Sequence, residues 1–135
     1  MKKIKKLLVF LPICVFILTV WQIQGEQMKN TEAITIKILI ENGNVICDPD
    51  PAEAEYGDTV IWISDYDFTV EFVKTPFKEK KFKADKKDKE KWSKSGIVTT
   101  KEAKEKKQKI RFKYSVEVIY EGESLTVDPD LDIKP

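Results

Sequence analysis

Alternation of apolar and polar residues is the feature that most constrains the fold of this chain. The longest run, residues 110–120, alternates over eleven positions, and residues 34–40, 59–63 and 68–72 are shorter β-prone runs. A period of two places successive side chains on opposite faces of an extended chain, so these runs predict β-strands. Repeated short strands separated by turns predict an all-β protein, either an antiparallel sandwich or a barrel.

Turn residues mark where these strands end. Asn42 and Gly43 predict a hairpin turn, and residues 121–124 predict another. Val45 and Ile46 begin a further run that stops at Asp48-Pro49-Asp50-Pro51, since proline cannot donate to a sheet ladder. A last short strand is predicted at residues 131–133, after Asp128-Pro129-Asp130. Residues 34–135 are enough to bury one core, so the sequence predicts a single β-sandwich domain.

The N-terminal 25 residues carry the pattern of an export signal. Four lysines in residues 2–6 precede an uncharged run from residue 7 to residue 21. The run extends with little polarity to residue 23, which is just long enough for one hydrophobic helix to span a bilayer. Lysines at its start keep that end in the cytoplasm. We therefore predict a signal peptide or signal anchor at 1–25, a polar linker at 26–33 and an extracytoplasmic domain at 34–135.

Whether the signal is cleaved stays open. Gly25 is small enough for the position directly before a signal-peptidase cleavage site. Ile23 would then lie at the third position before that site, which also prefers a small residue. Cys14 follows Pro12 and Ile13, which are poor residues for a lipoprotein box. The expected location is the bacterial cell membrane, single-pass with the C-terminal domain outside the cytoplasm. Cleavage would instead make the protein secreted or periplasmic.

The formal net charge of +1 conceals strong segregation of charge. Residues 26–73 hold two lysines and eleven acids, whereas residues 74–113 hold sixteen lysines and one arginine against six acids. Residues 78–109 read as a basic insert, with a solvated helix possible at 78–91, similar character at 101–109 and a short strand at 97–100.

The basic insert has three readings. It is a solvated loop, a docking surface for a protein partner or an anionic surface such as lipid head groups, or a segment masked by the acidic half of the same domain. Nucleic acid is not an expected partner, because the domain is exported and no base-stacking motif accompanies the lysines.

The chain has no histidine and only two cysteines. A Ser-His-Asp triad, a Cys-His pair and any histidine-ligated metal are therefore excluded. Cys14 lies in the hydrophobic run, which leaves Cys47 alone outside the membrane and rules out a disulfide scaffold. Cys47 reads as a buried thiol of a core strand, with an intermolecular disulfide or a reactive thiol as alternatives.

Six short motifs follow one another along the chain: Gly57-Asp58-Thr59-Val60-Ile61-Trp62, Phe68-Thr69-Val70-Glu71-Phe72, Thr75-Pro76-Phe77, Ser95-Gly96, Phe112-Lys113-Tyr114-Ser115-Val116 and Asp128-Pro129. Their order resembles the cupredoxin-like β-sandwich family. The resemblance spans residues 34–135 and implies a Greek-key sandwich.

The copper site that this resemblance implies is missing from the sequence. Copper-binding members have a His just before a Thr-Val pair, where this chain has Phe68, and a Cys two residues after a Tyr, where it has Val116. No His or Met follows, although blue copper depends on such ligands. The resemblance therefore implies a copperless bacterial member with no redox metal site and no cofactor.

Acidic residues offer the remaining candidates for chemistry. Asp48, Asp50, Glu53 and Glu55 lie in one loop, and Asp128, Asp130 and Asp132 lie near the C-terminus. They read as solvated loops or as a weak calcium or magnesium site, although the EF-hand spacing is absent. Asp65 and Asp67 flank Tyr66 at a turn, but nothing in the sequence gives them a cleft for acid–base work.

These observations favour a binding module over an enzyme. We expect an extracytoplasmic, membrane-anchored interaction module without catalytic, cofactor-binding or metal-ligating residues. The alternative is a carrier or sensor that binds a small ligand or a calcium-type ion through the acidic loops.

Overall fold

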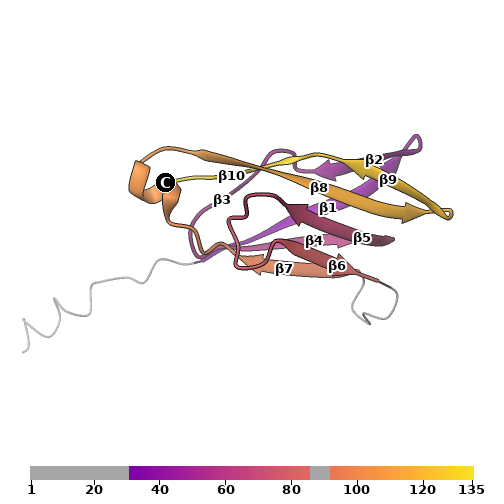
Figure 1. Ribbon diagram of the computed structural model, residues 1–135, viewed down its shortest axis with the longest axis horizontal. Helices are drawn as coiled ribbons and strands as arrows, with labels where there is room; N and C mark the ends of the chain where they lie inside the picture. The colour runs from indigo at the N-terminus through magenta and orange to yellow at the C-terminus, as the bar shows by residue number, and fades with distance from the viewer. Residues whose placement is uncertain (1–30, 86–91) are drawn as a thin grey trace, which may run out of the picture. The chain divides into compact units, whose positions relative to one another are not determined.

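Two β-sheets form a sandwich in the part of the chain that the structure describes, residues 31–85 and 92–135 (Figure 1). The structure is a computed structural model. Residues Thr31–Pro135 make one compact unit. The predicted all-β sandwich is confirmed.

The hydrophobic helix expected within residues 1–25 lies outside the described residues, as does most of the 26–33 linker. Within 31–85 and 92–135 no helix is long and apolar enough to cross a membrane.

The first sheet has four strands in the order β2-β1-β4-β7. They are β1 (Ala33–Glu41), β2 (Asn44–Asp48), β4 (Thr59–Ser64) and β7 (Ser93–Ile97). The predicted hairpin turn joins β1 to β2, and Asn42 and Gly43 both have positive φ, at 51° and 76°. These angles are those of a tight two-residue turn, which Asn and Gly adopt most easily. β1 also pairs in parallel with β4.

The second sheet has six strands. Its main order is β3-β10-β8-β5-β6, formed by β3 (Ala52–Ala54), β10 (Asp130–Ile133), β8 (Ile110–Tyr120), β5 (Asp67–Phe72) and β6 (Lys81–Ala84). β9 (Glu123–Val127) pairs with β8 as well. β9 and β10 keep one register along β8, since Val127 opposes Val116 and Asp130 opposes Lys113. They are therefore two parts of one arm of a long hairpin.

Aromatic rings fill the space between the sheets. Trp62 of β4 is fully buried and its ring centroid lies 4.9 Å from that of Phe82, 5.5 Å from Phe77 and 6.1 Å from both Phe72 and Tyr114. These rings come from both sheets and from the loop before β6. Large apolar side chains meeting at one point explain why strands with polar outer faces form a stable sandwich.

The described parts of the basic segment, residues 78–85 and 92–109, belong to the sandwich and correct two predictions. The helix considered for 78–91 is wrong over residues 81–84, which form β6, because Phe82 and Ala84 are buried between exposed lysines. The short strand expected at 97–100 is instead β7, at Ser93–Ile97. Helical structure does occur in α2 (Glu102–Lys106), as the similar character of 101–109 suggested. The strands β3 and β9 were not predicted.

Candidate functional site

The two positions that the resemblance compares with copper ligands lie side by side in the core. Phe68 of β5 opposes Val118, and Val70 of the same strand opposes Val116. Both Phe68 and Val116 are buried, with 2% and 0% of their surface exposed. These side chains offer no lone pair to a metal, so this part of the sandwich is packed as hydrophobic core.

The Gly57–Asp58 pair of the resemblance has a structural role. The buried Asp58 carboxylate accepts hydrogen bonds from the backbone N–H of Glu32 at 3.0 Å and of Glu55 at 2.8 Å. Gly57 has φ of 88°, a conformation that glycine adopts without strain. Together they tie the start of β1 to the turn before β4, which sets the parallel pairing of these strands.

Cys47 is a free, buried thiol of β2, as the simplest reading of the sequence predicted. Burial, and to a lesser extent Asp50, raises the pKa of Cys47 to about 12. The thiol is therefore protonated at neutral pH, which argues against a reactive nucleophile. Burial also raises the pKa of Tyr114. The Tyr114 hydroxyl and the Trp62 indole N–H are both buried between the sheets.

The two acidic clusters come together where β3 pairs in parallel with β10. Asp50 accepts a hydrogen bond from the backbone N–H of Asp130 at 3.0 Å, although 80 positions separate them in the sequence. Asp132 lies beside β3, opposite Glu53 in the register. The sequence could not show this meeting, because it depends on a pairing between distant strands.

Basic side chains neutralise this acidic cluster. Arg111 binds Asp132 with two hydrogen bonds of 2.8 and 3.0 Å, while Lys109 lies 2.8 Å from Glu53. The Arg111 hydrogen bonds lower the pKa of Asp132, and Lys109 lowers that of Glu53. Lys113 lies 3.4 Å from Asp130, and Lys134 lies 3.6 Å from Glu53. Of these four basic residues only Lys109 belongs to the basic segment 78–109, so internal masking is supported only at the C-terminal end of that segment.

The other acidic candidates have separate partners. Asp128 accepts a hydrogen bond from the Ser115 hydroxyl at 2.9 Å, and Asp48 faces Lys37 across the β1–β2 pair. Asp67 accepts a hydrogen bond from the Trp92 indole N–H at 2.6 Å. Asp67 therefore anchors the start of β7, and nothing joins it to Asp65 as a working pair of carboxylates.

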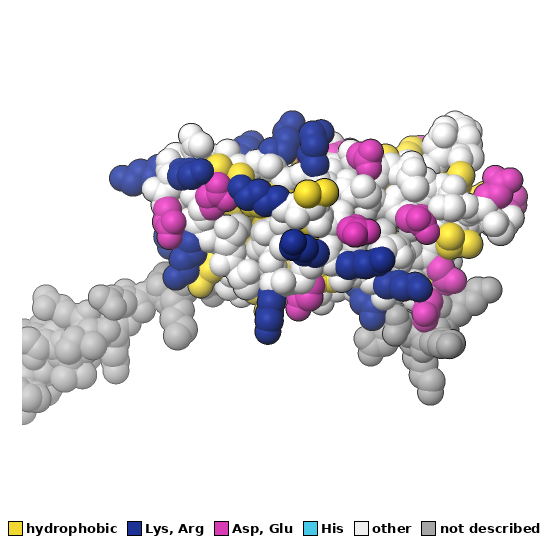
Figure 2. Space-filling model, viewed as in Figure 1, with side chains coloured by type: hydrophobic (Ala, Val, Ile, Leu, Met, Phe, Trp, Pro, Cys, Tyr) yellow, Lys and Arg dark blue, Asp and Glu magenta, His cyan; other side chains and the backbone are white. Residues whose placement is uncertain are grey.

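Among the described lysines that form no ion pair, four lie close together in sequence. We call Lys78, Lys80, Lys81 and Lys83 the basic strip; it comprises β6 and the loop residues just before it. All four are exposed, and none forms an ion pair with any residue in 31–85 or 92–135. In contrast, Lys74 and Lys106 both bind Glu102, at 3.0 and 2.9 Å. Figure 2 shows basic side chains along the border where Figure 1 places β6 and β7.

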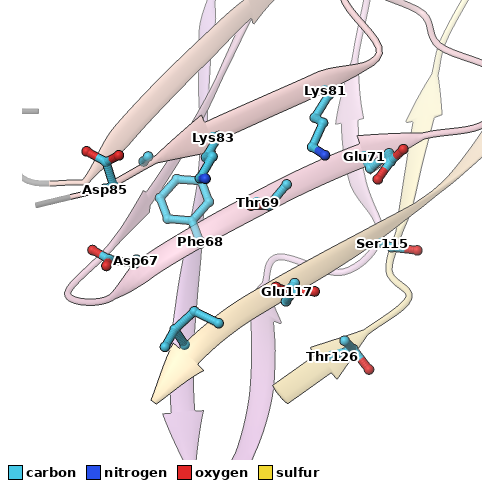
Figure 3. A pocket seen from close by; sticks show the side chains of 12 residues that line it. Asp67, Phe68, Thr69, Glu71, Lys81, Lys83, Asp85, Ser115, Glu117 and Thr126 are labelled. Atoms are coloured by element: carbon cyan, nitrogen blue, oxygen red, sulfur yellow. The ribbon is translucent and has the colours of Figure 1, made fainter. Parts of the chain in front are cut away.

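The basic strip borders a shallow groove on the outer face of the six-stranded sheet (Figure 3). The groove has a volume of about 560 Å³ and is lined by residues of β5, β6, β8 and β9, most of them with outward side chains. Lys81 lies opposite Glu71, and Lys83 lies opposite Thr69, across the β5–β6 pair. Its lining is therefore polar, with both signs of charge, and suits a partner that brings its own charged groups.

The outer face of the four-stranded sheet has a different character. Leu39, Ile46 and Ile97 are exposed there, at 37%, 36% and 58%, and the half-buried Ile61 and Ile63 lie between them. A groove of about 600 Å³ at one end of this face is lined mainly by β1 and β4. This face therefore combines exposed isoleucine and leucine side chains with a few charged ones, such as Lys37 and Asp48, whereas the groove on the six-stranded sheet is mainly polar and charged.

No group of three or more acidic or cysteine side chains in the described segments is arranged to hold a metal ion.

No family model matches the chain, and no curated protein matches it. Among solved structures, the chain is similar to the reduced Cu(I) form of an amicyanin mutant at pH 4, with a TM-score of 0.42 and 16% sequence identity. That similarity covers 81% of this chain and 87% of amicyanin. The two-sheet architecture itself rests on the strand pairing described above.

Proposed function

We propose that this protein is an exported, membrane-anchored binding module that contacts an anionic partner through the basic strip and performs no redox chemistry. Within this proposal the sandwich is a Greek-key, cupredoxin-like domain without copper. The motifs at residues 57–62 and 112–116 support that kinship, and the buried Phe68 and Val116 support the loss of the metal. The basic and hydrophobic pattern of residues 1–25 supports export.

The pairing of the lysines is the observation that carries the proposal. Among the described residues, Lys74, Lys106, Lys109, Arg111, Lys113 and Lys134 form ion pairs with acids of the same domain, whereas Lys78, Lys80, Lys81 and Lys83 form none and follow one another along one edge of the sheet. Lys101, Lys104 and Lys107 also form no ion pair with a described residue, but they belong to a different element, in and around α2. An unpaired cluster of like charge steers an oppositely charged partner and orients it on contact. Exposed ion pairs contribute about 0.2–1 kcal/mol each, so four of them change a dissociation constant by roughly tenfold or more.

A binding assay on the full-length protein tests the proposal. The protein is placed in phosphatidylcholine nanodiscs, and labelled poly-L-glutamate is titrated while its fluorescence anisotropy is followed at increasing NaCl concentration. We expect binding that weakens with salt, because exposed charge pairs are screened. Replacing all four lysines of the basic strip with Gln should weaken binding by about tenfold.

The matched control replaces Lys37, Lys101, Lys104 and Lys107 with Gln. These residues are also exposed, and the change in net charge is the same. Binding of the control should stay near that of the parent protein. Equal losses in both variants would mean that overall charge acts and the basic strip does not, and absence of any binding would contradict the proposal. Crosslinking in intact cells followed by mass spectrometry would then identify the natural partner.

The second candidate, a carrier or sensor for a calcium-type ion, has less support. Its acidic loops do meet in space, yet their carboxylates are engaged by Arg111, Lys109, Lys113 and Lys134. A cation would have to displace these basic groups before it could bind. Isothermal titration calorimetry distinguishes the two candidate functions. Heat on titration with calcium would support the carrier hypothesis. Absence of heat with calcium, copper, zinc and small anions would contradict it.

A further inference from the structure

β6 is the outer strand of its sheet. It pairs with β5 on one side, and no strand follows it in the order β3-β10-β8-β5-β6. The backbone N–H of Phe72 donates to the carbonyl of Lys80 at 2.8 Å, which fixes the alternation of hydrogen bonds along the pair. In an antiparallel ladder every second residue bonds to the neighbouring strand. Phe82 and Ala84 therefore bond to β5, while the N–H and C=O groups of Lys81 and Lys83 point to the open edge.

The open edge has unused hydrogen-bonding capacity. No backbone–backbone hydrogen bond within 31–85 and 92–135 involves Lys81 or Lys83 at this edge. A groove of about 290 Å³, lined by Lys78, Glu79 and residues 95–97 and 99, lies between the residues just before β6 and the strand β7. Figure 1 shows β6 and β7 at the same border of the sandwich. The edge thus offers donors and acceptors at the position where another strand would add to the sheet.

We propose that this edge binds an extended, acidic segment of a partner protein as an added β-strand. This inference rests on the proposed function and names the class of partner. Backbone groups of the segment bond to Lys81 and Lys83, and carboxylates at alternate positions of the segment lie beside the ammonium groups of the same two lysines. Residues two apart on a strand lie about 7 Å apart on one face, so an alternating acidic segment matches the lysines in spacing and charge.

The charges of Lys81 and Lys83 determine which kind of strand can pair with the open edge of β6. A second copy of this chain would bring its own β6 against the first, with lysine facing lysine, and like charges directly opposite each other are destabilising. Lysines on an edge generally keep neutral strands away, because pairing would cover their charges without compensation. Carboxylates remove that penalty. The same two side chains therefore exclude self-pairing and admit an acidic strand.

The test uses the full-length protein in phosphatidylcholine nanodiscs and two synthetic peptides of equal charge. In the first peptide Glu alternates with Thr. The second has the same sequence, but its backbone nitrogens are methylated at alternate positions, so it keeps the carboxylates and loses the N–H groups needed for strand pairing. Hydrogen exchange of residues 80–85 is followed by mass spectrometry with and without each peptide.

The first peptide should slow exchange at Lys81 and Lys83, and the methylated peptide should not. Lys81→Gln with Lys83→Gln should weaken binding of the first peptide about fivefold, the loss expected for two exposed ion pairs. Lys104→Gln with Lys107→Gln, an equal change of charge on the exposed end of α2, should leave binding unchanged.

Equal binding of both peptides without slowed exchange would overturn the added strand and leave the proposed function intact. Failure of both peptides and of poly-L-glutamate to bind would overturn the two proposals together.

Discussion

Gly96 is a buried glycine of β7 against which two aromatic rings of the core pack. A β-carbon built on Gly96 would lie 2.9 Å from the Phe77 ring and 2.9 Å from the Phe82 ring. Both rings pack against Trp62, so neither can move without disturbing the centre of the core. Because Gly96 has no side chain, the two rings can approach the backbone of β7 this closely. Glycine in a strand often marks such a close approach.

Gly96→Ala should destabilise the domain by about 1–3 kcal/mol, the usual cost of overpacking a core. The measurement is the midpoint of urea unfolding, followed by circular dichroism. Ser95→Ala is the control, because Ser95 is exposed in the same strand and its replacement adds no atom to the core. An unchanged midpoint for Gly96→Ala would mean that the rings can shift freely.

Among the elements, β6 shows how packing overrides composition. Its four residues, Lys81–Ala84, include two lysines, and a lysine-rich stretch with no helical apolar face reads as a solvated segment. In the structure Phe82 packs against Trp62 at 4.9 Å between ring centroids, Ala84 is also buried, and the strand pairs with β5. The alternation over these few residues was visible in the sequence, but too short to distinguish from chance.

The alternation of buried and exposed residues in β6 predicts that neighbouring substitutions differ greatly in their effect on the free energy of unfolding. Phe82→Ala should cost about 3–5 kcal/mol, as for other buried Phe residues. Lys81→Gln with Lys83→Gln should leave stability within about 0.5 kcal/mol of the parent, because both side chains are exposed. Urea unfolding measures both. A helix at this position would make no such distinction between odd and even residues, so similar losses in the two variants would contradict the strand.

At the scale of the whole molecule, acidic and basic residues that lie in separate parts of the sequence form ion pairs with one another. Arg111 and Lys109 lie in the basic part of the chain, and Glu53 and Asp132 lie in its two acidic parts. The β3–β10 and β8–β10 pairs bring them within hydrogen-bonding distance of each other. Asp132 keeps only 2% of its side chain exposed, so its charge depends on Arg111.

Arg111→Gln should lower stability at neutral pH and weaken its dependence on acid. The pKa of Asp132 is lower in the folded protein, so the stabilisation is present above the unfolded pKa, about 3.9, and is lost as the pH falls through the folded value. Because Arg111→Gln lacks the ion pair with Asp132, its free energy of unfolding should fall less than that of the parent as the pH is lowered. Urea midpoints across acidic pH test this, with Lys113→Gln as a control for an exposed pair. Parallel pH profiles for parent and Arg111→Gln would contradict the role of the pair.

The sequence by itself determined the fold class and several strands. Residues 34–40, 59–63, 68–72 and 110–120 all form strands, because alternation with a period of two suits only an extended chain with one face buried. The absence of histidine by itself likewise excludes histidine chemistry. Cys47 also lies buried in a strand, as its apolar neighbours indicated.

Only the tertiary structure decided which charges are free. Ion pairs form between residues far apart in the chain, such as Lys109 and Glu53, and their meeting depends on the register of distant strands. The same reason hid β3, which has three residues and is defined by its parallel partner β10. A count of lysines could therefore identify a basic segment. The sheet order was needed to show that Lys81 and Lys83 lie on an open edge without acidic partners.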